Sequence, residues 1–172
     1  MQELLKQLEQ FGKKHYMFNI SRETGEFLHN LIKQFKPQNI LEVGTSNGYS
    51  TIWLASAAKE FGKVTTIEID ENKIKLAKEN FKKANLDNIH LVYGNALKII
   101  PELNEEFDFV FLDAVKKDYL KYLKSIKLSK GAIITAHNVV SHKNKMLDYL
   151  EFVKSNFESR TYKDLDLEVS FL

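Results

Sequence analysis

The sequence predicts an α/β fold in which a mostly parallel sheet carries helices on both faces. Short apolar segments rich in β-branched residues alternate with longer segments whose apolar residues recur at helical spacing. Such alternation is typical of a parallel sheet covered on both sides. At 172 residues, 44% of them hydrophobic, the chain can build one packed core and has little room for a second. No repeat, low-complexity tract or linker divides it, so we expect a single domain over residues 1–172.

Residues 1–36 are expected to form an N-terminal pair of helices. The first carries apolar residues at helical spacing, namely Leu4, Leu5, Leu8 and Phe11. The second is expected to begin at Ser21, a favourable N-cap residue, with Glu23 and Glu26 in its first turns. Its apolar residues are Phe27, Leu28, Leu31 and Ile32. Pro37 ends this part of the chain.

Strand-like and helix-like segments alternate through residues 37–172. Strands are expected at 39–43, 64–69, 89–93, 107–112, 132–136 and 167–172, where apolar, β-branched or aromatic residues cluster. Helices are expected at 50–61, which Gly62 ends, and at 71–84, 119–126 and 145–157. The helix at 71–84 points Ile74, Leu76, Ala77 and Phe81 inward. The last segment alternates apolar and polar residues after a helix and a short loop, which favours an antiparallel strand at the edge of the sheet.

The composition excludes several kinds of site. The chain has no cysteine, so a disulfide framework, a thiolate zinc site and a cysteine nucleophile are excluded, and a reducing cytoplasm is the expected location. We expect no membrane partner, because no apolar run has transmembrane length and the N-terminal MQELLKQLEQFGKK is amphipathic and charged. The net charge is only +2, and Arg22 and Arg160 are the only arginines, which disfavours nucleic acid as a partner without excluding it.

A glycine-containing turn follows the first strand, at the end where open α/β sheets bind ligands. It reads Glu42-Val43-Gly44-Thr45-Ser46-Asn47-Gly48. Gly44 allows a sharp turn and a close approach of the ligand, and Gly48 opens a helix whose free amides attract an anionic group. Ser46 stands where a dinucleotide fold has its middle glycine, which disfavours a pyrophosphate. The acid inside the strand, Glu42, suits a smaller ligand with an ammonium group.

The next two strand ends carry residues suited to a nucleoside. Glu68 follows Gly48 by 20 residues (68 − 48), the place where an acid hydrogen-bonds ribose hydroxyls. Asn95 and Ala96 follow Gly94 at the third strand end, where a short polar residue suits an adenine edge. Each feature alone has a plain structural explanation, a tight turn for the glycines and a solvated strand end for Glu68. Their occurrence in register at three strand ends favours a nucleoside site.

Several motifs in fixed order extend from about Ile20 to the C-terminus. They read ISRETGEFLHNLIK, ILEVGTSNGYSTIWLA, TIEID, GNALKIIPEL, FDFVFLDAVKKDYLKYL and GAIITAHNVVSH. The chain thereby resembles the catechol and caffeoyl-CoA type O-methyltransferase family, including its bacterial and archaeal members. The resemblance implies a Rossmann-like class I methyltransferase fold with a seven-stranded sheet, in which residues 37–172 are the cofactor-binding core. It also implies S-adenosylmethionine as methyl donor and a divalent cation that binds the acceptor hydroxyls.

The matching positions imply the site residues. Those on cofactor-binding positions are Glu42, Gly44, Ser50, Glu68, Asn95 and Ala96, beside Ser46 and Gly48 of the turn. Asp113 falls on a metal ligand that also lies near the methionine part of the cofactor. Lys116 falls on the lysine taken as general base. The plain alternatives are a helix N-cap for Asp113 and a solvated helix start for Lys116.

Two departures from the family pattern affect the site. Where the family ends its fifth strand with an Asp-Asn pair that completes the metal site, this chain has His137 and Asn138. A site of Asp113, His137 and Asn138 exchanges a carboxylate for an imidazole, which favours Mn²⁺ or another transition metal over Mg²⁺. The alternative is no metal at all, with Lys116 or His142 as the base, although a loop histidine such as His142 is more often only polar surface. The chain is also shorter than most relatives at its N-terminus, where helices wall the acceptor pocket or form a dimer.

The leading expectation is an S-adenosylmethionine-dependent O-methyltransferase acting on a hydroxyl of a small, phenolic or catechol-like molecule. One alternative is an RNA methyltransferase, for instance of tRNA, because Lys117, Lys121 and Lys124 share one helix face, which a solvated surface explains more simply. Another is an S-adenosylmethionine-binding module without turnover, which the altered metal site allows. We also expect a homodimer, since the family often dimerises and the N-terminal helix and the final strand offer apolar surface.

Overall fold

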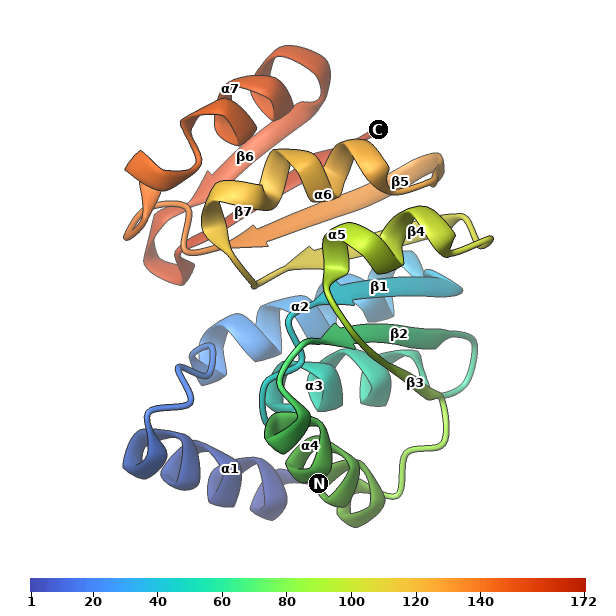
Figure 1. Cartoon of the computed structure of the whole chain (residues 1–172), viewed down its shortest axis with the longest axis vertical. Coiled ribbons are helices and arrows are strands. Elements are labelled where there is room, and N and C mark those ends of the chain that lie inside the picture. The colour runs from blue at the N-terminus through green and yellow to red at the C-terminus, as the bar shows by residue number, and fades with distance from the viewer.

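The computed structural model describes all 172 residues and contains one seven-stranded sheet (Figure 1). The strands are β1 (Asn39–Val43), β2 (Lys63–Glu68), β3 (Ile89–Tyr93), β4 (Phe107–Leu112), β5 (Leu128–His137), β6 (Glu158–Tyr162) and β7 (Leu167–Phe171). Their order across the sheet is β3-β2-β1-β4-β5-β7-β6. β1 to β5 are parallel, and β7 lies antiparallel between β5 and β6. The prediction of a mostly parallel seven-stranded sheet with an antiparallel edge is confirmed.

The antiparallel edge is built differently from what the sequence indicated. The final strand, β7, lies inside the sheet, and β6, for which no strand was expected, forms the edge. The residues of β6 are mostly polar and half-buried or exposed, as an edge strand open to solvent permits. They therefore lack the apolar run that reveals a buried strand. β7 in contrast buries Leu167 to Ser170, which agrees with its place between two neighbours.

Helices cover both faces of the sheet, as predicted (Figure 1). They are α1 (Gln2–His15), α2 (Arg22–Phe35), α3 (Tyr49–Ala58), α4 (Glu71–Ala84), α5 (Ala96–Ile99), α6 (Tyr119–Ser125) and α7 (Leu147–Asn156), with 3₁₀ turns η1 (Ile100–Glu102), η2 (Lys116–Asp118), η3 (Lys143–Lys145) and η4 (Lys163–Leu165). One core takes side chains from α1 to α4, such as Leu5, Leu28, Ile52 and Ala77. The other takes them from α6 and α7, such as Leu123 and Val153. None of these helices is both long and apolar enough to cross a membrane.

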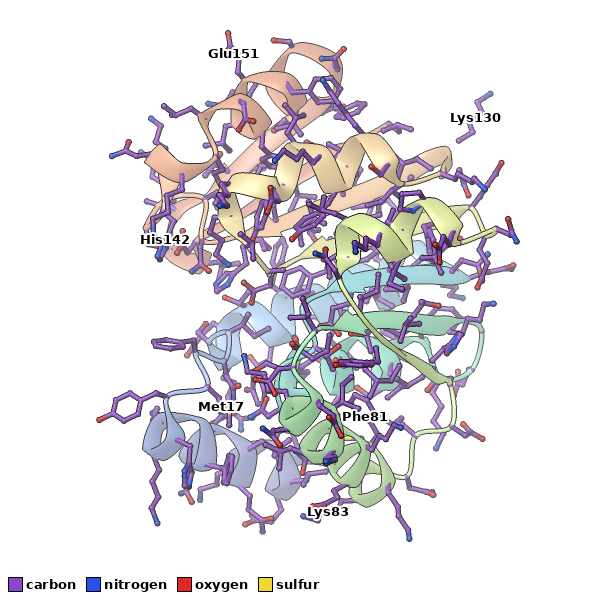
Figure 2. All side chains as sticks on the ribbon, in the orientation of Figure 1. Met17, Phe81, Lys83, Lys130, His142 and Glu151 are labelled. Carbon is purple, nitrogen blue, oxygen red and sulfur yellow. The ribbon has the colours of Figure 1, made fainter.

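The carboxyl ends of the parallel strands lie together at one end of the sheet. The register pairs Val43 with Leu112 and Glu68 with Tyr93, so the turns after β1, β2, β3 and β4 begin side by side. The strand order changes direction between β1 and β4, which is the switch point where open α/β sheets bind ligands. Figure 2 shows His142, just beyond the end of β5, on the opposite side of the molecule from Lys130 near its start.

Candidate functional site

A cavity of about 730 Å³ opens at the carboxyl ends of the parallel strands. Its wall contains most of the site residues expected from the sequence, namely Gly44, Ser46, Ser50, Glu68, Asn95, Ala96, Asp113, Lys116, His137, Asn138 and His142. Residues 17–20, between α1 and α2, also line the cavity, and the sequence analysis singled out none of them as site residues. Figure 2 shows Met17 and His142 on the same side of the molecule. The cavity is thus enclosed between the strand ends and the N-terminal helices.

The turn after β1 requires a glycine at position 44. Gly44 has φ +106°, and a Cβ atom there would lie 2.3 Å from the carbonyl oxygen of Asp113. Its N–H donates to the carbonyl of Ile67 over 3.0 Å, which ties the turn to the end of β2. The backbone therefore passes between β2 and β4 with no side chain between it and the cavity.

Glu68 joins the first two strand ends through its carboxylate. Oε2 accepts the N–H of Ser46 over 2.8 Å, and Oε1 accepts the N–H groups of Ile69 at 2.9 Å and Asp70 at 3.0 Å. Glu68 is 7% exposed and lines the cavity. A carboxylate offers about four acceptor positions, so one remains for a hydroxyl in the cavity. This arrangement fits the expected ribose contact.

Glu42 does not line the cavity, contrary to the expectation that its carboxylate would meet the ligand. Its side chain is 0% exposed. Its carboxylate accepts hydrogen bonds from the hydroxyl groups of Ser50 over 2.6 Å, Thr66 over 2.6 Å and Thr51. Ser50 does line the cavity, so Glu42 is connected to the cavity only through that hydroxyl. Gly48 likewise lies outside the wall, at φ +84° against the ring of Phe81, where it opens α3. The alternation of apolar and polar residues along β1 does not reveal that Glu42 is buried away from the cavity, because it does not show which side chains a buried acid contacts.

Burial raises the pKa of Glu42 to about 7, although hydrogen bonds from Ser50, Thr51 and Thr66 oppose the rise. Because the folded pKa lies above the unfolded one, this carboxyl stabilises the fold most below about pH 4.5 and loses that contribution as pH rises through 7. We expect the unfolding free energy of the wild type, relative to Glu42→Gln, to fall by roughly 3 kcal/mol between about pH 4 and about pH 8. Urea unfolding at several pH values measures this difference, and parallel curves for the two proteins would refute the assignment.

Asp113, Lys116 and His137 form a cluster at the ends of β4 and β5. Lys116 Nζ donates to Asp113 Oδ1 over 2.7 Å, and His137 Nδ1 lies 3.3 Å from Asp113 Oδ2. Burial acts to raise the pKa of Asp113, but the contact with His137 and the charge of Lys116 outweigh it and hold the pKa below its usual range. The cluster therefore presents an ionised carboxylate and an ammonium group to the cavity.

The hydrogen bonds of His137 and Asn138 show which of their atoms remain free to bind the expected cation. His137 is 8% exposed, and its Nδ1 has no hydrogen-bond partner although it lies 3.3 Å from Asp113 Oδ2. Asn138 donates its amide nitrogen to Asp166 Oδ2 over 3.2 Å, which leaves its amide oxygen free. Its left-handed backbone, at φ +63°, supplies the bend that two consecutive donors need. No three His, Cys, Asp or Glu side chains gather into a metal site, so a cation here would depend on one carboxylate, one imidazole and one amide.

Asp166, which the sequence analysis did not single out, fixes the loop that follows β5. Its Oδ1 accepts the N–H groups of Val140 over 2.6 Å and Ser141 over 3.0 Å, and its Oδ2 accepts from Asn138 and from the hydroxyl of Ser141. The carboxylate thereby ties residues 138–141 to the turn before β7. Its place 28 residues after Asn138 gives it no signal in the spacing of the sequence.

Asp166→Asn is expected to destabilise the fold by about 1–3 kcal/mol, because charge-assisted hydrogen bonds to the loop are lost. Asparagine is preferred to alanine here, since Asp166 has φ +52°, a backbone conformation that asparagine tolerates. Chemical denaturation measures the loss. Asp164→Asn is the control, because Asp164 is exposed; an equal effect of both substitutions would contradict the role of Asp166.

His142 and the lysines of η2 and α6 were also singled out in the sequence. His142 lines the cavity, and its Nδ1 lies 3.0 Å from the hydroxyl of Ser141. On the lysine face of α6, Lys121 pairs with Asp118 over 2.9 Å, and Lys124 lies over the ring of Phe152. Two of the three lysines thus have partners within the chain, which weakens the case for a phosphate-binding surface.

Comparison with known proteins gives matches along most of the chain. A family model described as O-methyltransferase matches residues 1–155. The catechol O-methyltransferase of Niastella koreensis is 38% identical over 137 residues, which cover 76% of this chain and 62% of that protein. The catechol O-methyltransferase of Mycobacterium tuberculosis is 37% identical over 125 residues, which cover 70% of this chain and 57% of that protein. The chain thus spans less than two thirds of the length of these two relatives.

Solved structures show the same fold. The O-methyltransferase from Bacillus cereus, in complex with SAH, has a TM-score of 0.86 and 26% sequence identity to this chain. The similarity covers 99% of this chain and 90% of that one. The arrangement of sheet and helices described above is therefore shared over the whole chain.

Proposed function

Because this chain belongs to the O-methyltransferase family, we propose that it transfers a methyl group from S-adenosylmethionine to a hydroxyl group of a small molecule. The observation that carries the proposal is the free acceptor position of the Glu68 carboxylate in a cavity at the switch point of the sheet. The relative from Bacillus cereus, whose structure was solved with SAH, supports the same ligand class.

The residues of the cavity fit the parts of this donor. Glu68 is placed to accept a hydrogen bond from a ribose hydroxyl, and Asn95 and Ala96 are proposed to border the adenine. Asn95 Oδ1 caps α5 by accepting the N–H of Leu97 over 2.9 Å, so its amide nitrogen is the group left for a ligand. Gly44, Ser46, Ser50 and Asp113 are proposed to hold the amino-acid end, where the Asp113 carboxylate suits an ammonium group.

The sulfonium supplies an activated methyl group, and the protein must align the acceptor oxygen with it and remove the hydroxyl proton. Lys116 lines the cavity with its ammonium group held by Asp113, and we propose that it stabilises negative charge on the acceptor oxygen. His142 is the second proposed catalytic group, since its imidazole can accept a proton at the cavity wall. A divalent cation, held by Asp113, His137 and Asn138, would polarise the acceptor hydroxyl.

The acceptor is proposed to be phenolic or catechol-like. Met17, Phe18 and Val115 contribute apolar wall next to the polar cluster, which suits an aromatic ring bearing a hydroxyl. The two relatives named catechol O-methyltransferase support this class. An assay with methyl-labelled S-adenosylmethionine against catechols, monophenols and tRNA tests the proposal. Label in a catechol is the expected result. Label only in tRNA would identify an RNA methyltransferase instead. Binding of S-adenosylmethionine without any transfer would indicate a binding module without turnover.

We propose a homodimer that uses the end of the final strand, one of the two surfaces expected from the sequence. α1 packs Leu5 and Leu8 into its own core, and β7 is paired on both sides. Exposed apolar surface remains at Phe35 and Leu172, which are 48% and 46% exposed. Light scattering at micromolar concentration is expected to give twice the mass of one chain, and the single-chain value of 20.0 kDa would contradict the dimer.

A further inference from the structure

His137 is the one proposed ligand that departs from the family pattern. We propose that it makes the cation site of this cavity prefer a nitrogen-accepting transition ion such as Mn²⁺ to Mg²⁺, an inference that rests on the proposed function. The imidazole is almost fully buried at the end of β5, and its Nδ1 faces Asp113 without a hydrogen bond. A buried polar atom without a partner is costly, so a ligand at this nitrogen would remove that cost.

The positions of the neighbouring donors are consistent with one shared ion. His137 Nδ1 and Asp113 Oδ2 are 3.3 Å apart, a separation that suits two ligands of one ion with bonds of about 2.1 Å. Lys116 occupies the other carboxylate oxygen, Oδ1, and leaves Oδ2 to face the imidazole. An ion can therefore bind between Asp113 Oδ2 and His137 Nδ1 without displacing Lys116.

Asn138 contributes the third donor because Asp166 orients it. The amide nitrogen donates to Asp166 Oδ2 over 3.2 Å and to the hydroxyl of Ser141 over 3.4 Å. Both contacts fix the amide with its oxygen unengaged. Outer carboxylates commonly orient metal ligands in this way. Asp166 is thus a positioning residue for the cation site.

The charge of the cluster decides which ion it favours. Asp113 is the only carboxylate among the three donors, and the ammonium of Lys116 already balances its charge. Mg²⁺ depends chiefly on carboxylate oxygens and gives up its water ligands reluctantly, so it gains little here. An ion that accepts imidazole nitrogen recovers part of the binding energy through His137.

Displacement of Mn²⁺ by Mg²⁺, followed through the electron paramagnetic resonance signal of free Mn²⁺, tests the inference on the full chain. We expect one bound Mn²⁺ per chain and an affinity for Mg²⁺ about tenfold weaker or more. His137→Asp is expected to narrow this ratio, because it restores a carboxylate. His90→Asn is the matched control, since His90 is an exposed histidine on β3, and it should leave the ratio unchanged.

Three results would overturn the inference: no bound Mn²⁺, Mg²⁺ binding as tightly as Mn²⁺, or the same ratio in His137→Asp. If the aspartate variant does not fold, His137→Asn replaces it, and an unchanged affinity for Mn²⁺ in that variant overturns the inference too. Calorimetry with S-adenosylhomocysteine is run on the same preparations. Absence of cofactor binding would contradict the proposed function, whereas the ion ratio alone judges this inference.

Discussion

Glu68→Ala is expected to weaken the binding of S-adenosylhomocysteine about tenfold or more, because a charge-assisted hydrogen bond to a ribose is worth about 1.5–3 kcal/mol. Glu68 is nearly buried at the end of β2, and three backbone N–H groups already hold its carboxylate in position. No other acidic side chain at the second strand end lines the cavity. Isothermal titration calorimetry measures the affinity.

Asp70→Asn is the matched control for this prediction. Asp70 lies two residues further on and caps α4 outside the cavity, and asparagine caps helices equally well. The affinity of the Asp70→Asn variant for S-adenosylhomocysteine should equal that of the wild type. Because Glu68 also supports the turns after β1 and β2, Glu68→Gln is measured alongside, and thermal unfolding confirms that each variant is folded. Unchanged affinity in a folded Glu68→Ala protein would refute the ribose assignment.

Gly44→Ala is expected to destabilise the fold by about 3 kcal/mol or more and to abolish cofactor binding. The added Cβ atom would lie 2.3 Å from the carbonyl oxygen and 2.9 Å from the carbonyl carbon of Asp113. These are backbone atoms at the end of β4, so the clash cannot be relieved by turning a side chain. The strand ends would have to separate, and with them Asp113 would move.

Gly131→Ala is the control that separates the steric clash with Asp113 from the cost of placing alanine at a positive φ angle. Gly131 also has a positive φ, +77°, but a Cβ atom there meets nothing within 4 Å. Its cost is therefore the conformational one alone, about 1–2 kcal/mol. Guanidinium unfolding of the two variants measures the difference, and equal losses would show that the contact with Asp113 does not matter.

The sequence predicted the fold well where periodicity is strong. Strand 107–112 and helix 71–84 were predicted with the bounds found, since each has one clear apolar pattern. The edge strand β6 was missed because its mostly polar residues carry no such pattern, and α5 because four residues are too few to show a helical period. Local patterns thus found the buried elements and missed those that depend on their neighbours.

The site was predictable where it follows from topology. Gly44, Glu68, Asn95 and Asp113 each lie at or just after the end of a parallel strand, and such ends meet in any sheet of this kind. Residues 17–20 reach the cavity, and Asp166 reaches the loop after β5, only through tertiary packing, which leaves no spacing to recognise in the sequence. The burial of Glu42 outside the cavity wall was not predictable for a related reason. Its partners Ser50, Thr51 and Thr66 lie on other elements, and only the packed structure brings them to it.

A crystal structure of the chain with S-adenosylhomocysteine tests the central claim most directly. We expect the ligand in the cavity at the strand ends, with a ribose hydroxyl on the Glu68 carboxylate and the adenine beside Asn95 and Ala96. Its amino-acid end should lie against Gly44, Ser50 and Asp113. A ligand bound elsewhere, or an empty cavity at saturating S-adenosylhomocysteine, would contradict the assignment of this site to methyl transfer.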